Sequence, residues 1–143
     1  MLTQQGHRLV FRYGFEEVWI EAWGKDAVRV RATKSRPMKE EAWALTEPIE
    51  QTKSSITVEE DGARLSNGKI YAAISKLGKI MVRNSNGKVL LEEYARNRTD
   101  LLDPKCSALN IAAREFKPRL GGEYHITLRL ESLSKEEKLH GMG

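Results

Sequence analysis

The sequence contains a single cysteine, Cys106, and no hydrophobic run long enough to cross a membrane. One thiol cannot form an intrachain disulfide, and a cysteine-based zinc cluster needs several thiolates at short spacing. A membrane helix needs about 20 consecutive apolar residues, and residues 1–15 also lack the apolar stretch of a signal peptide. We therefore expect a soluble, cytoplasmic protein with one hydrophobic core and no membrane partner.

A strong excess of one charge is also lacking, because 24 Lys and Arg residues stand against 20 Asp and Glu residues, which gives a net charge of +4. The densest basic stretch, Arg29–Lys39, has no aromatic residue on which a base could stack. We interpret it as the solvated face of a strand followed by a surface loop, and we expect no nucleic-acid partner.

No segment has a helical stripe, and the dominant period of apolar residues is two. In residues 27–33, Val28 and Val30 point to one face while Arg29 and Arg31 point to the other, as in a strand that covers a core on one side. The same alternation recurs in residues 17–23, 69–75, 79–84 and 124–132. In the last of these segments it predicts a core-facing row that includes Ile126 and Leu128.

Glycine turns separate these segments. Asp61-Gly62, Asn67-Gly68 and Asn86-Gly87 are typical of two-residue hairpins, whose turns need a positive φ, and they predict a meander of strands over residues 56–94. About ten short strands with frequent turns indicate an all-β protein, folded as an antiparallel β-sandwich. The aperiodic stretch Arg96–Ser107 predicts a long loop, and such loops are usually functional or disordered.

The motifs of common active sites are missing. His7, His125 and His140 are far apart, and none lies beside a nucleophile or in a zinc motif. The acidic residues include five adjacent pairs, at 16–17, 40–41, 59–60, 92–93 and 136–137. Because neighbours in a strand face opposite sides, we interpret all five pairs as solvated charge. We expect no self-sufficient active site, no metal site and no cofactor in this chain.

Aromatic residues remain as candidates for binding. Trp19, Trp23 and Trp43, with Tyr13, can stack on sugar rings or can cover a neighbouring domain. A free-standing carbohydrate-binding sandwich with Trp19 and Trp23 as its platform is therefore an alternative function. An epimerase that uses a His and a Glu in a cleft ranks last, because only His125 and Glu131 share a strand face.

The C-terminal residues resemble a known family. Residues 121–143 are similar to the end of the N-terminal β-sandwich in glycoside hydrolase family 31, where a strand like YHITLRLES leads to a Glu-x-(Leu/Phe)-(Tyr/His)-Gly-(Met/Leu)-Gly turn, here residues 137–143. Residues 13–34, 67–70 and 80–90 are also similar to strands of that domain. The resemblance implies a galactose-mutarotase-like supersandwich over residues 1–133, with residues 134–143 beginning the connection to a (β/α)8 catalytic domain that this chain lacks.

The resemblance further implies that the parent protein is a retaining α-glucosidase or α-xylosidase acting on α-linked oligosaccharides. In that family the nucleophile and the acid/base, ~5–5.5 Å apart, are aspartates of the barrel. No residue of this chain then has a catalytic role. The family's N-terminal domain packs on the barrel and sends a loop toward the pocket, and the best match is residues 96–117. We therefore expect Arg114 and Phe116 as substrate-binding residues, and self-association through the uncovered domain interface.

Overall fold

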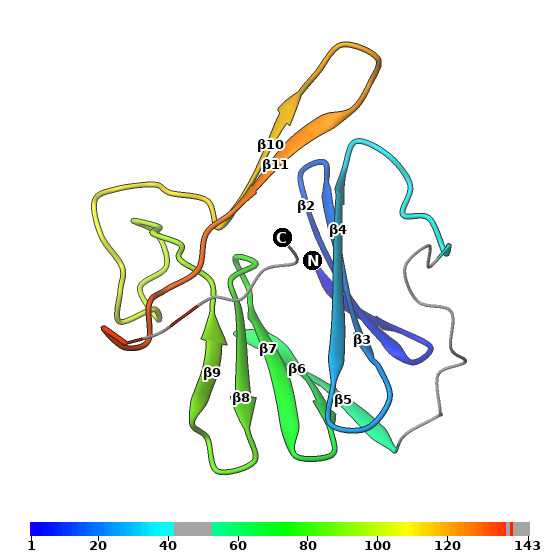
Figure 1. The fold of residues 1–143 in the computed structure, drawn as a ribbon, viewed down its shortest axis with the longest axis vertical. Coiled ribbons are helices and arrows are strands. Elements are labelled where there is room, and N and C mark those ends of the chain that lie inside the picture. Colours follow the sequence, from blue (N-terminus) through cyan, green and yellow to red (C-terminus); the bar gives the residue numbers. More distant parts are fainter. Residues whose placement is uncertain (42–52, 137, 139–143) are drawn as a thin grey trace.

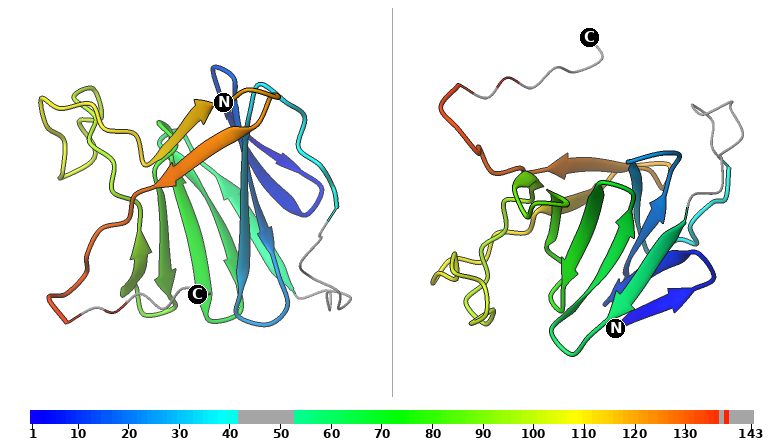
Figure 2. Two further views of the ribbon diagram at one scale, coloured as in Figure 1. Left: turned by 45° about the horizontal axis from the view of Figure 1, so that its top comes forward. Right: turned by 90° about the horizontal axis from the view of Figure 1, so that it is seen from below.

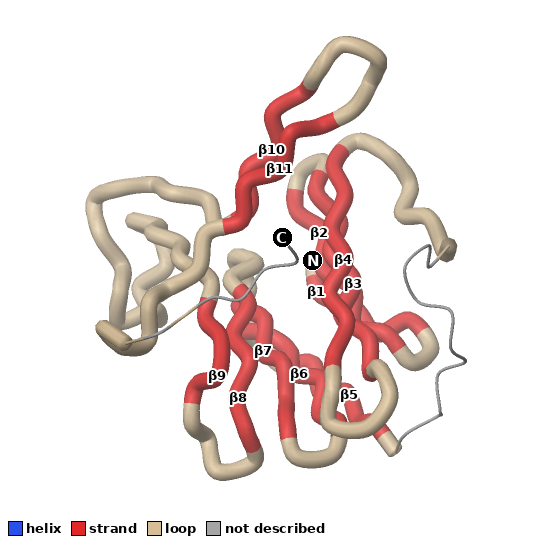
Figure 3. The backbone as a smooth tube through the Cα atoms, viewed as in Figure 1, coloured by secondary structure: helices blue, strands red, loops and turns tan. Residues whose placement is uncertain are grey.

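The structure is a computed structural model that describes residues 1–41, 53–136 and 138. These residues form eleven strands and no helix (Figure 3). The strands are β1 (Leu2–Gln5), β2 (Arg8–Tyr13), β3 (Glu16–Ala22), β4 (Val28–Lys34), β5 (Ser54–Val58), β6 (Gly62–Asn67), β7 (Ile70–Ser75), β8 (Ile80–Asn84), β9 (Val89–Glu92), β10 (Arg114–Pro118) and β11 (Tyr124–Leu128).

The strands form three antiparallel sheets (Figure 1). The first has the order β1-β2-β3-β4, and the second has the order β5-β6-β7-β8-β9, so both are simple meanders. Strands β10 and β11 pair only with each other, and this hairpin extends away from the two larger sheets. The predicted all-β antiparallel sandwich and the meander over residues 56–94 are confirmed.

The core lies between the first and second sheets, which face each other in Figure 2. Alternate residues of each strand point inward because side chains of a strand alternate between its faces. The fully buried positions of β2 and β3 meet those of β6, β7 and β8. The core residues are Leu9, Phe11, Val18 and Ile20 from the first sheet, and Ala63, Leu65, Ala72, Ile74 and Ile80 from the second.

A polar contact joins the turns of the two sheets. The side chain of Asn67, which is 1% exposed, donates hydrogen bonds to the carbonyl oxygens of Gly24 (2.8 Å) and Ala27 (2.7 Å) in the β3–β4 turn. Asp26 of that turn accepts a bond from the backbone N–H of Lys69 at 2.7 Å. Gly68 has a φ of 59°, and a Cβ on it would lie 2.0 Å from the Asp26 carboxylate. A side chain at position 68 would therefore displace the Asp26 carboxylate from its hydrogen bond with Lys69, and the positive φ would add strain.

Three details of the predicted pattern are wrong. Val30 is 42% exposed in the edge strand β4, although Val28 and Ala32 on the same face of the strand pack against the core. Ile126 and Leu128 are 56% and 55% exposed, because the β10–β11 hairpin stands outside the sandwich. Gly62 has no positive φ, and its glycine is required for another reason: a Cβ there would lie 2.5 Å from the carbonyl oxygen of Ile74.

Truncation of one core leucine tests this packing. We expect Leu65→Ala to lower the free energy of unfolding by about 2–5 kcal/mol, because Leu65 is fully buried and its truncation leaves a cavity. The matched control Leu120→Ala removes a side chain that is fully exposed at the hairpin turn, and it should change the value by less than about 0.5 kcal/mol. Urea unfolding of both variants measures the difference, and equal effects would contradict this core.

Candidate functional site

The long connection between β9 and β10 is the predicted loop. Its base is closed by an isolated bridge in which the backbones of Arg96 and Ile111 exchange hydrogen bonds of 2.9 and 2.8 Å. The loop therefore includes all of the predicted stretch Arg96–Ser107 and extends a few residues further. It lies beside the second sheet (yellow in Figure 2).

A chain of ion pairs fixes this loop to the sheet. Lys79 Nζ lies 2.8 Å from Glu92 and 2.7 Å from Asp103, so the start of β8 is joined to the end of β9 and to the loop. Lys105 Nζ continues the chain to Glu92 at 2.9 Å and to Glu131 at 3.4 Å. The side chains of Lys79 and Glu92 are only 9% and 8% exposed, so water screens this pair little.

The charges in this network shift one another's pKa values. Burial alone would raise the pKa of Glu92 and of Asp103, but hydrogen bonds from Lys79 and neighbouring donors outweigh burial, and both pKa values lie below the ordinary range. Burial alone would lower the pKa of Lys79, yet Asp103 and Glu92 raise it above its ordinary value. All three groups are therefore held in their charged forms at neutral pH.

Arg114, one of the two predicted substrate-binding residues, lies at the start of β10 with its side chain inside the protein. Its guanidinium pairs with both carboxylate oxygens of Glu93 and donates to Glu16 at 2.6 Å and to the carbonyl oxygen of Gly78 at 2.7 Å. Burial raises the pKa of Glu93, although Arg114 and the backbone N–H of Ile80 act in the opposite direction. The donors of Arg114 are thus occupied by protein, and its contact with substrate stays a prediction.

Phe116, the second predicted residue, is 9% exposed, and its ring meets the edge of Tyr124 at a centroid distance of 6.1 Å. It shares a face of the hairpin with Arg114 and with the exposed Ile126, its cross-strand partner. The ring is therefore largely buried, and its stacking on a sugar stays a prediction.

The tryptophan platform of the alternative function is covered. Trp19 is 7% exposed, because the guanidinium carbons of Arg8 and Arg31 lie 3.9 and 4.9 Å from its ring centroid. Trp23 lies under Arg29 at 4.4 Å. Trp43 lies outside the described residues. Trp19 therefore presents no open face to a sugar, and Trp23 is half-buried with one face under Arg29, which counts against a platform built from both rings.

The two residues of the epimerase hypothesis, His125 and Glu131, have different environments. His125 is exposed on the hairpin, whereas the carboxylate of Glu131 is bound by Arg96 at 2.5 Å and by Lys105. His140 and the terminal turn at 137–143 lie outside the described residues, apart from Lys138, and the predicted boundary after residue 133 stays a prediction. No group of three or more His, Cys, Asp or Glu residues among those described is placed to hold a metal ion.

Sequence reasoning missed the most buried charges. Glu92 and Glu93 are 6% and 3% exposed, so the interpretation of this pair as solvated charge is wrong. The two side chains do face opposite sides, as expected for neighbours: Glu92 binds lysines and Glu93 binds Arg114. The sequence around this pair carries no signal of burial, because the cations that make the burial of these carboxylates tolerable come from segments distant in the sequence.

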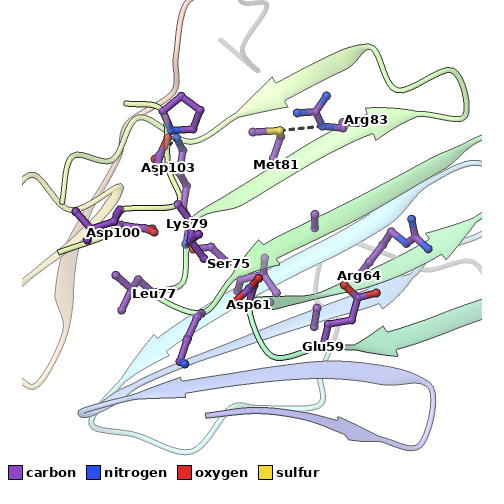
Figure 4. A pocket seen from close by; sticks show the side chains of 18 of the residues that line it. Glu59, Asp61, Arg64, Ser75, Leu77, Lys79, Met81, Arg83, Asp100 and Asp103 are labelled. Atoms are coloured by element: carbon purple, nitrogen blue, oxygen red, sulfur yellow. Dashed lines mark hydrogen bonds and ion pairs between the residues drawn. The ribbon is translucent and has the colours of Figure 1, made fainter. Parts of the chain in front are cut away.

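A cleft of about 830 Å³ lies on the outer face of the second sheet (Figure 4). Its floor includes Ala73 and Met81, and residues 99–104 of the β9–β10 loop form one wall. Asp100 and Asp103 lie at the loop end of the cleft, and Arg64 lies at the other end. The predicted long loop thus forms one wall of a concave surface.

Comparisons with known proteins agree with this fold. No family model matches the chain. An uncharacterized family 31 glucosidase of Pseudescherichia vulneris is 34% identical over 150 aligned positions, which cover 99% of this chain and 28% of that protein. The crystal structure of a family 31 α-xylosidase from a soil metagenome, complexed with xylose, matches with a TM-score of 0.84 and 35% identity, over 94% of this chain and 21% of that one. The chain thus spans about a quarter of the length of these relatives.

Removal of Arg114 tests the buried ion pair. We expect Arg114→Met to lower the free energy of unfolding by about 3–5 kcal/mol, because Glu93 then remains buried without a cation. The control Arg129→Met breaks a surface pair with Glu115 whose side chains are both 35% exposed, and it should cost about 0–1 kcal/mol. Urea unfolding measures both, and the double variant Arg114→Met/Glu93→Gln should recover part of the loss.

The loop network predicts a dependence on pH. Because the pKa of Asp103 is lowered from 3.8 in the folded state, its stabilisation is complete above that value and is lost as the pH falls through the lowered one. The backbone N–H of Lys105, which donates to Asp103 at 2.9 Å, should report this in an NMR titration with a midpoint below 3.8. Lys79→Met should raise the midpoint. The N–H of Thr99, bonded to neutral Asn97, is the control.

Proposed function

We propose, from the correspondence of this chain to the N-terminal β-sandwich of family 31 glycosidases, that it is the non-catalytic N-terminal domain of a retaining α-glycosidase. The observation that carries the proposal is the coverage: the match includes nearly the whole chain but only 28% and 21% of the two relatives. The catalytic groups would then lie in a (β/α)8 domain elsewhere in the same polypeptide.

The domain's role in this proposal is to pack on the catalytic domain and to shape one wall of the substrate pocket. Its loop is held at the base by the bridge between Arg96 and Ile111 and by the ion pair of Lys79 with Asp103, and a wall must hold its position to select a substrate. Arg114 and Phe116 would serve this wall by fixing the hairpin and the loop, and a direct contact with the sugar is the stronger form of the same proposal. The substrate class would be α-glucosides or α-xylosides.

Exposed apolar side chains support an interface with another part of the protein. Leu101 and Leu102 in the loop are 85% and 70% exposed, and Ile126 and Leu128 on the hairpin are more than half exposed. If this chain is made alone, we expect it to self-associate through these side chains. The single Cys106 fits a cytoplasmic location, and the described residues contain no helix that could span a membrane.

Enzyme assays test the proposal directly. We expect the full-length protein to hydrolyse an aryl α-glucoside or an aryl α-xyloside, and this 143-residue chain to hydrolyse neither, because the catalytic carboxylates would lie in the other domain. Release of the aryl group, followed by absorbance, is the measurement. Turnover by the short chain would contradict the proposal and would direct attention to His125, Glu131 and the loop.

A further inference from the structure

We propose that the cleft on the outer face of the second sheet binds a neutral, α-linked oligosaccharide. The sugar rings lie on the apolar floor of the cleft, and their hydroxyl groups bond to the charged side chains that line it. The choice of sugar rests on the proposed function, which makes α-glucosides or α-xylosides the substrate class. The inference adds a sugar-binding site that residues of this chain form, and it names the groups that bind the sugar.

The hollow of the cleft comes from one cross-strand row of side chains. Ala73 of β7 lies between Arg64 of β6 and Met81 of β8, which are its cross-strand partners. A small side chain between two long ones leaves a depression, and the floor at Ala73 and Met81 carries no charge, so the C–H face of a sugar ring can lie on it. The cleft volume of about 830 Å³ is within the range of about 300–1,000 Å³ that is typical of ligand sites.

The charged side chains that line the cleft balance in sign. Lys79 and Asp103 pair with each other at 2.7 Å. The other charged side chains of the lining form no ion pair with any residue within 1–41, 53–136 or 138. Their acidic members are Glu59, Asp61 and Asp100, and their basic members are Arg64, Lys76 and Arg83. A ligand with a net charge would meet as many like charges as opposite ones, so this lining favours a neutral ligand.

Carboxylates and cations together suit the hydroxyl groups of a sugar. A hydroxyl group both donates and accepts, a carboxylate only accepts, and guanidinium and ammonium groups only donate. Glu59 and Arg64 lie at one end of the cleft, Asp61 lies midway and Asp100 lies at the loop end (Figure 4). The guanidinium of Arg64 also packs on the ring of Tyr71, at 5.5 Å from its centroid. Donors and acceptors thus line the length of the cleft, so more than one ring of an oligosaccharide has partners.

The position of the floor disfavours an extended peptide as the ligand. A peptide that adds a strand to a sheet pairs with the free backbone groups of an edge. The order of the second sheet places β6, β7 and β8 inside it, where their backbones pair with neighbouring strands on both sides. The cleft floor therefore offers a ligand side chains only, which is the usual situation in a site for a small molecule.

Methyl NMR of the full-length protein, isotopically labelled in its methionine methyl groups, tests the site. Met81 lies in the cleft floor, and Met38, in the segment after β4, is the matched control. Met81→Leu and Met38→Leu identify the two signals. The probes are thio-linked maltotetraose and thio-linked isoprimeverose, an α-glucan and an α-xyloside whose sulfur linkages resist hydrolysis. We expect at least one probe to shift the Met81 signal to saturation below about 10 mM, while the Met38 signal stays in place.

Variants of the lining locate the bound sugar. Asp61→Ala removes an acceptor from the middle of the cleft, and we expect it to raise the Kd of the probe at least about tenfold, because a charge-assisted hydrogen bond is lost. Arg64→Gln removes a cationic donor and is expected to have an effect of the same size. Glu123→Ala removes an exposed carboxylate at the hairpin turn and should leave the Kd unchanged. An unchanged Met38 signal shows that each variant is folded.

The outcomes separate the sugar site from the proposed function. A Met81 signal that neither probe moves would overturn the inference. A Kd that Asp61→Ala and Arg64→Gln both leave unchanged would also overturn it, because the sugar would then bind elsewhere. Hydrolysis of aryl α-glycosides by the same protein is measured in parallel. A saturating shift without hydrolysis contradicts the proposed function and leaves the sugar site, whereas hydrolysis without a shift does the reverse.

Discussion

The side chain of Arg114 joins all three sheets of this protein. From β10 it reaches Glu16 at the start of β3, Gly78 beside β8 and Glu93 at the end of β9. Each of these contacts is a charge-assisted hydrogen bond, and the side chains of Arg114 and Glu93 are 9% and 4% exposed, so the bonds between them are strong when every group has a partner. The hairpin β10–β11 has no other sheet to pair with, and a two-stranded hairpin alone is only marginally stable. Backbone hydrogen bonds tie the C-terminal end of the hairpin to the end of β9, since Tyr94 donates to Arg129 and Glu131 donates to Glu92. The guanidinium of Arg114 adds the side-chain contacts that join the start of β10 to both larger sheets.

The same junction explains why Gly78 is glycine. Its φ is 90°, and a Cβ would lie 2.6 Å from the ring of Phe11, a fully buried core residue. The glycine lets the β7–β8 turn lie directly on the core while its carbonyl oxygen accepts from Arg114. The hydrophobic core and the buried ion pair thus meet at Gly78. Substitutions in the core and substitutions in the ion pair are therefore expected to have non-additive effects on the free energy of unfolding.

The sequence predicts well where a property is local. Alternation of apolar residues identifies the strands, and Asn-Gly pairs identify the hairpins with positive φ at Gly68 and Gly87. It predicts poorly where the property depends on the neighbours of a strand. Ile126 and Leu128 have the pattern of a core strand, yet no sheet covers them. Glu93 has the pattern of a surface carboxylate, yet Arg114, which lies 21 residues away in the sequence, makes its burial tolerable.

These errors have a common direction. The exposed apolar residues lie on the hairpin and on the loop tip, while the charges expected on the surface lie buried beneath them. Burial of these apolar side chains and exposure of the charges would give the domain a larger free energy of unfolding, since apolar burial is the main favourable term in folding. Buried ion pairs fix the relative positions of the segments they join more readily than they raise the free energy of unfolding. The polar network therefore joins the loop and the hairpin to the two larger sheets, and the apolar side chains that the loop and the hairpin carry add little to the stability of the described residues because they remain exposed.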